Sequence, residues 1–131
     1  MVRRRGPEEG AAAIEMAMVA PVFMALVFGI LNLGWALYCG AEVRHAVERS
    51  SRMLIVDPTT TGAAIQTAVR AQLDAADSAT VTVARATEAI GTSGEVARLT
   101  WTYGYTVAVP FLKPIVLDFN SSLVVPLRPD A

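Results

Sequence analysis

The chain has 131 residues, enough for one small domain at most. Hydrophobic residues make up 53% of it and the mean hydropathy is +0.44, which is high for a soluble protein. The formal net charge is −1, so the composition gives no electrostatic indication of nucleic-acid binding.

The first ten residues, MVRRRGPEEG, are polar, contain Gly and Pro, and show no periodicity. We therefore expect a short flexible leader over residues 1–10. Three consecutive arginines, Arg3, Arg4 and Arg5, precede the apolar part of the chain. Because positive residues beside a first span stay in the cytoplasm, this triplet predicts a cytoplasmic N-terminus and a C-terminal part across the membrane.

A run of 26 residues without charge extends from Met16 to Ala41, between Glu15 and Glu42. At about 1.5 Å per helical residue it is long enough to cross a hydrocarbon core of about 30 Å. A buried core helix is the alternative, but such apolar stretches usually end after about 10–14 residues. The run therefore predicts one membrane span over about residues 16–41, which we expect to bend at Pro21.

The helical pattern continues beyond the span, so we expect one helix over residues 11–57. Glu48 and Arg52 are spaced for an i,i+4 ion pair. Asp57-Pro58 then ends the helix. Apolar or small residues recur at helical spacing on one face of this extension, which makes it amphipathic: Val43, Ala46, Val47, Ser50, Met53 and Leu54.

Residues 58–131 are expected to form an extracytoplasmic domain. Thr59 to Gly62 supplies an N-cap, and residues 65–76 have the spacing of a short second helix. Thr80 to Arg85 alternates with a period of two, as a strand does. A turn is expected at Gly91 to Gly94.

The clearest strand pattern runs from Arg98 to Val109, where polar residues alternate with apolar ones. Pro110 ends this strand, residues 111–114 form a corner, and Ser121 to Leu127 gives a last strand, which Pro126 limits to an edge or end. The order of elements predicts an α+β fold with an antiparallel sheet of three or more strands, whose apolar face is covered by the outer half of the first helix. That face comprises Leu99, Trp101, Tyr103, Tyr105, Val107 and Val109.

The sequence carries no recognisable catalytic or metal-binding pattern, so we expect neither enzyme activity nor a cofactor. The single histidine, His45, lies among charged residues and is interpreted as a solvated helix residue. The single cysteine, Cys39, is interpreted as a small packing residue, with an intermolecular disulfide or lipid attachment as alternatives. The aromatic row of Trp101, Tyr103 and Tyr105 is interpreted as a core face rather than a binding platform.

Glu15 stands directly before the apolar run and five residues after Gly10, where an unpaired carboxylate is costly if it enters the membrane. Alternatively, Glu15 lies in the headgroup layer at a helix N-terminus, where negative charge is favoured. Gly followed five residues later by Glu is the arrangement of a type IV prepilin. The stretch GAAAIEMAMVAPVFMALVFGILNLGWALY, with Ala20-Pro21, Phe28-Gly29 and Asn32-Leu33-Gly34, resembles the TadE-like pseudopilin family. The resemblance is strongest over about residues 5–58 and implies a pilin-like fold.

The resemblance implies that a membrane prepilin peptidase cuts between Gly10 and Ala11 on the cytoplasmic face. Cleavage would remove the arginines and leave a free amine on Ala11. In a helical assembly, the Glu15 carboxylate of one subunit would pair with the Ala11 ammonium of its neighbour and fix the axial register. Met16 occupies the position at which the family usually has Phe or Tyr.

Two pairs of small residues in the span, Ala25 with Gly29 and Ala36 with Gly40, have the spacing that permits close helix packing in lipid. They are the candidate helix-packing residues, and their predicted partners are other pilin or pseudopilin subunits.

The resemblance implies a minor pilin or pseudopilin that takes part in assembly of a tight-adherence (Flp) type IV pilus for surface adhesion. Its implied partners include the tight-adherence assembly machinery. We expect it in the bacterial inner membrane, with its C-terminal domain in the periplasm, and no nucleic-acid or small-molecule partner. The alternative is an unprocessed, single-pass anchored scaffold or binding module. A secreted protein with an ordinary signal peptide fits poorly, since the apolar run far exceeds the usual 7–15 residues.

Overall fold

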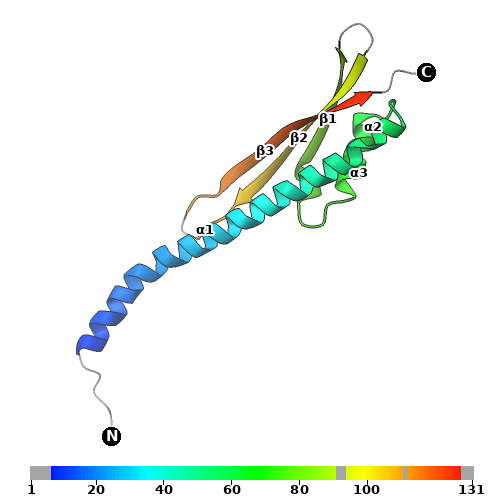
Figure 1. The fold of residues 1–131 in the computed structure, drawn as a ribbon. Helices are drawn as coiled ribbons and strands as arrows, with labels where there is room; N and C mark the ends of the chain where they lie inside the picture. The colour runs from blue at the N-terminus through cyan, green and yellow to red at the C-terminus, as the bar shows by residue number, and fades with distance from the viewer. Residues whose placement is uncertain (1–6, 91–93, 111, 128–131) are drawn as a thin grey trace.

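A computed structural model describes residues 7–90, 94–110 and 112–127. Its longest element is α1, Pro7–Ser51, which projects well past the rest of the fold and curves along its N-terminal part (Figure 1). The helix begins four residues before the expected start at Ala11, and it continues through Pro21. Apart from residues 7–10, the expected leader lies outside the described residues.

The first helical region ends where the sequence predicts, but with a break one turn earlier. Ser51 ends α1, and a short helix α2, Met53–Val56, follows Arg52. The backbone N–H of Asp57 donates to the Met53 carbonyl and closes α2, so the Asp57-Pro58 stop is confirmed. The expected Glu48–Arg52 ion pair is wrong: Glu48 pairs with Arg44 one turn earlier, at 2.8 Å, and Arg52 stands at the break.

The predicted second helix corresponds to α3, which spans Gly62–Arg70 and ends earlier than predicted. Its start is as expected, because the Thr61 hydroxyl caps the backbone N–H of Ala64. The predicted end at Ala76 is wrong, because the backbone N–H groups of Asp74, Ala75 and Ala76 donate to the Glu42 carboxylate rather than to helical carbonyls.

A 3₁₀ turn, Ser78–Thr80, leads into the three-stranded antiparallel sheet, whose order is β1-β2-β3. The strands are β1, Val81–Ile90; β2, Gly94–Val107; and β3, Ile115–Leu127. All three were expected, but β1 and β3 are longer than the alternation in the sequence predicts. Strand β2 begins four residues before the expected start at Arg98 and ends two residues before the expected end at Val109. Pro126 lies in the edge strand β3, as expected. Of the expected turn at Gly91 to Gly94, only Gly94 lies within the described residues.

The core lies between one face of the sheet and a layer made of α1 and α3 (Figure 1). Leu99, Trp101 and Tyr103 of β2 are buried there, which confirms the aromatic row as a core face. The outer half of α1 covers this face, as predicted. Its contribution to the core is Cys39, Val43, Ala46 and Val47.

Candidate functional site

Helix α1 divides into two parts with different surroundings. From Gly10 to Trp35, here called the uncovered segment, large apolar side chains are exposed around the helix. From Ala36 to Ser51, here called the covered half, one face is buried under the sheet domain. The helix contains an 18-residue window with a mean hydropathy of 2.2 and no burial, so it is long and apolar enough to cross a membrane.

The predicted processing residues lie on the first turns of the uncovered segment. Gly10 and Ala11 are exposed, and a Cβ added to Gly10 would meet nothing within 4 Å. Glu15 and Met16 are exposed as well, and Glu15 stands four residues after Ala11 along the helix. Within the described residues, these four positions are therefore accessible for contacts outside the chain.

The two small-residue pairs lie in different surroundings. Ala36 is fully buried, and a Cβ at Gly40 would lie 3.1–3.3 Å from the ring of Phe119 in β3. The space over this pair is thus filled by the chain's own sheet. Ala25 and Gly29 are partly exposed, and a Cβ at Gly29 would lie 4.0 Å from a methyl group of Val109. Contact of this second pair with a neighbouring helix stays a prediction.

Asn32 connects the uncovered segment to the sheet, a contact that the sequence did not predict. Its side-chain amide donates to the Phe28 carbonyl at 3.0 Å and to the Ala108 carbonyl, just after β2, at 3.1 Å. A polar side chain in an apolar run is costly in lipid unless it is hydrogen-bonded. The sequence could therefore indicate that Asn32 needs a hydrogen-bond partner. It could not identify the Ala108 carbonyl, because that contact depends on the tertiary fold.

Glu42, directly after the apolar run, anchors the segment between α3 and the sheet. Its carboxylate accepts backbone hydrogen bonds from Asp74 at 2.7 Å, Ala75 at 3.1 Å and Ala76 at 2.8 Å. Partial burial acts to raise the pKa of Glu42, but these three donors outweigh it and lower the pKa below its ordinary value. The sequence marked Glu42 only as the boundary of the apolar run.

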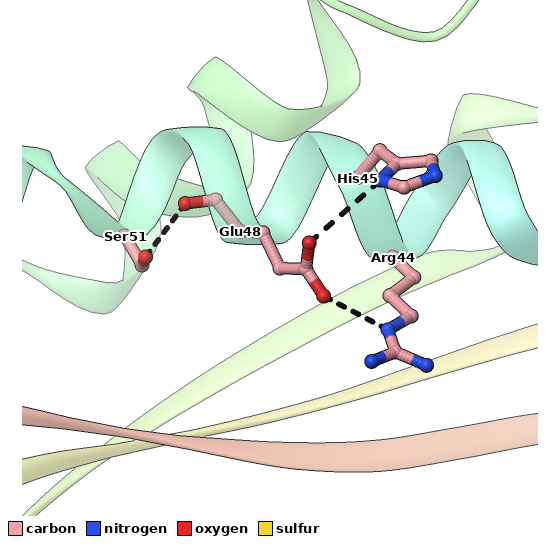
Figure 2. A network of polar contacts seen from close by, with 4 residues as sticks. All are labelled: Arg44, His45, Glu48 and Ser51. Atoms are coloured by element: carbon pink, nitrogen blue, oxygen red, sulfur yellow. Dashed lines mark hydrogen bonds and ion pairs between the residues drawn. The ribbon is translucent and has the colours of Figure 1, made fainter.

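The polar face of the covered half carries a local charge network (Figure 2). Arg44 Nε donates to Glu48 at 2.8 Å, and His45 Nδ1 lies 3.7 Å from the second Glu48 oxygen. The hydrogen bond from Arg44, with smaller contributions from the Arg44 charge and from His45, lowers the pKa of Glu48. His45 is exposed, as predicted, so this network lies on a solvated helix face.

Cys39 is fully buried and lies against Tyr103, as a packing residue does. Burial, with Cys39 as a neighbour, raises the pKa of Tyr103 to about 12. Tyr103 in turn stacks on Phe119, with ring centroids 6.1 Å apart. Burial of Cys39 leaves no accessible thiol for the alternatives of an intermolecular disulfide or a lipid.

Comparison with known proteins gives a match over almost all of α1. Residues 10–52 match the family model described as TadE-like protein. Residues 10–52 are thus similar to TadE-like proteins. The matched region contains both the uncovered segment and the covered half of α1, and it ends at the break before α2. No curated protein and no solved structure matches the chain.

The TadE-like match agrees with the resemblance seen in the sequence from Gly10 onward, and it associates the chain with the membrane and with pilus components in general. Of the four predicted N-terminal site residues, Gly10, Ala11, Glu15 and Met16 all fall inside the match. Among the described residues, no group of three or more His, Cys, Asp or Glu side chains is placed to hold a metal ion.

Proposed function

We propose that this TadE-like chain is a minor pilin or pseudopilin of a tight-adherence (Flp) type IV pilus, with a structural and not a catalytic role. The observation that supports this most is the uncovered segment of α1. Its large apolar side chains are mostly exposed in the described chain, which touches this segment at Gly29 and Asn32, whereas the covered half of the same helix is packed against the sheet. A helix built in this way is suited first to lipid and then to the helices of other subunits.

In this proposal a prepilin peptidase cuts between Gly10 and Ala11 on the cytoplasmic face. The new Ala11 ammonium group forms an ion pair with the Glu15 carboxylate of a neighbouring subunit. Both residues lie on α1 and are exposed, so a neighbouring helix can reach them without a change in the fold. In a low-dielectric helix bundle the pair offsets the desolvation of both charges.

The size of the sheet domain favours a minor component over the main subunit, because the resemblance implies a main subunit that is little more than the helix. The alternative function is an unprocessed inner-membrane anchor that carries a periplasmic scaffold or binding module. The covered half and the sheet would serve either role, so the discriminating residues are those of the N-terminal turns.

Substitution of Gly10 tests the proposal because the fold does not constrain it. A Cβ at Gly10 or at Gly34 meets nothing within 4 Å, so Gly10→Leu and Gly34→Leu form a matched pair. Mass spectrometry of membranes from a host with an active prepilin peptidase should show wild type and Gly34→Leu starting at Ala11. Gly10→Leu should remain full length. Full-length wild-type protein in that host would contradict the proposal.

Substitution of Glu15 separates processing from assembly. Glu15→Gln keeps the size of the side chain but removes the charge that pairs with the Ala11 ammonium. The proposal expects loss of the protein from sheared pili for this variant. An anchor that never assembles would show no difference between Glu15→Gln and wild type in any fraction.

A further inference from the structure

The loop end of the β2–β3 hairpin lies beside the apolar run of α1. We define the hairpin tip as Val107–Pro110 together with Leu112–Val116. Asn32 donates to the carbonyl of Ala108, and Gly29 faces the side chain of Val109. The sheet therefore extends along α1 to the level of residues 29–32, well inside the charge-free run (Figure 1).

The depth of this contact follows from the length of the run. A hydrocarbon core of about 30 Å takes up about 20 helical residues, and the charge-free run has 26, between Glu15 and Glu42. Any such window placed within the run includes residues 22–35. Gly29 and Asn32 lie in every such window, so the hairpin tip beside them lies at the depth of the acyl chains wherever the helix is centred.

Aromatic side chains mark the corresponding boundary on the helix. Trp35 and Tyr38 are about half exposed and their rings lie 5.6 Å apart. They stand three and six residues after Asn32, toward the sheet domain. Exposed Trp and Tyr are enriched at the membrane–water interface. The contacts of the tip with α1 lie on the lipid side of this aromatic pair.

The outward face of the sheet changes polarity at the same level. From Arg98 to Thr106 the outward positions of β2 are polar apart from Gly104, and the next outward position is Ala108. On β3 the outward residues Ser122, Asn120 and Asp118 are followed toward the tip by Val116. Leu112, Ile115 and Val116 are apolar but 58–63% exposed, because nothing in the described chain covers them.

Some backbone polar groups of the tip are absent or are hydrogen-bonded within the chain. Pro110 and Pro114 have no N–H group, the Leu112 N–H donates to the Val109 carbonyl, and the Ala108 carbonyl accepts from Asn32. An unpaired backbone polar group is costly in an apolar environment, so these two hydrogen bonds and the two prolines lower the cost of placing the tip in the leaflet. Lys113 is the one charged residue of the tip, and its long side chain can extend to the headgroups.

From these observations we propose that the hairpin tip is a second membrane-contacting element, inserted in the leaflet next to the sheet domain and held to the span by Asn32. The occupant of the exposed apolar surface of the tip is lipid. The proposal requires the helix to span a bilayer but is independent of its orientation and of cleavage at Gly10.

Site-directed spin labelling of the full chain in phosphatidylcholine–phosphatidylglycerol vesicles tests the insertion. In a Cys39→Ala background, single cysteines replace Leu112 and Val116 at the tip, Ile30 on the exposed span and Thr102 on the outward face of the sheet. All four side chains are exposed, so a nitroxide at each is compatible with the fold. The measurement is the collision rate of the label with oxygen and with a water-soluble nickel chelate.

We expect the oxygen-to-nickel collision ratio at positions 112 and 116 to be several-fold higher than at position 102 and close to that at position 30. A ratio at the tip equal to that at position 102 would place the tip in water and overturn the proposal. Protection from both reagents at the tip would also overturn it, because a protein partner would then cover the surface. Processing at Gly10 is read separately by mass, so failure here leaves the proposed function standing.

Discussion

The two parts of α1 are made of one continuous backbone but have different environments. In the covered half a single apolar stripe faces the sheet, and charged residues such as Arg44 and Glu48 occupy the opposite face. In the uncovered segment apolar residues point in all directions. The apolar stripe of the covered half packs within the chain, whereas apolar residues all around a helix are typical of a helix that lies in lipid or is buried among other helices.

The largest effect should come from filling the contact between the covered half and the sheet. A side chain at Gly40 would collide with the Phe119 ring, which lies 3.1 Å from the position of a Cβ. Gly40→Leu should destabilise the sheet domain by about 3 kcal/mol or more, since overpacking forces neighbouring elements apart. Thermal unfolding in detergent, followed by near-ultraviolet circular dichroism, measures the change. Gly34→Leu is the matched control in the uncovered segment and should leave the transition in place.

Two valines on the same helix give the next comparison. Val43 is fully buried in the core, whereas Val22 is 68% exposed in the uncovered segment. Val43→Ala should lower the free energy of unfolding by about 2 kcal/mol because it leaves a cavity. Val22→Ala should have almost no effect on unfolding of the sheet domain. Equal effects from the two variants would refute the division of α1.

Glu42, near the junction of the two parts, should make stability depend on pH. Its pKa is lowered in the folded state, so its contribution is fully present above the ordinary pKa and is lost as the pH falls through the lowered folded value. Glu42→Gln should cost about 1–2 kcal/mol at neutral pH, because one charged acceptor of three N–H donors is replaced by a neutral one. It should also flatten the decline of stability at acidic pH, as measured by denaturant unfolding from neutral to acidic pH. If the pH profile of Glu42→Gln were the same as that of wild type, titration of Glu42 would not contribute to stability.

The smallest effect is expected on the exposed face of the covered half. Arg44→Ala breaks the hydrogen bond to Glu48, but both side chains are solvated, so water and counter-ions replace the pair. The unfolding transition in detergent should not move measurably at moderate salt. A clear loss of stability would mean that this face is packed against something in the folded protein.

Much of the fold follows from periodicity. The buried positions Val43, Val47 and Leu54 and the aromatic row on β2 could be predicted, because each lies on one face at the period of its element. The far part of β1 could not, because Ala86 to Ile90 are all exposed and leave no apolar alternation. Its length is set by pairing with β2, where Arg98 meets Glu88 at 2.7 Å.

The sequence revealed different parts of the candidate site to different degrees. Gly10 and Glu15 are recognisable because their spacing belongs to a family pattern. Asn32 and Glu42 were visible as polar residues in or beside an apolar run, but their partners, Ala108 and the 74–76 backbone, are far away in the chain. Such contacts depend on how the hairpin and the segment after α3 fold back onto α1, which no local pattern encodes.

The most direct test of the central claim is the N-terminal sequence of the protein recovered from membranes and from sheared pili of the same cells. We predict that both fractions begin at Ala11, with the sequence AAAIE, and that the pilus fraction contains the protein. Membrane protein that still begins at Met1, together with its absence from sheared pili, would contradict the proposal that α1 is an assembly helix.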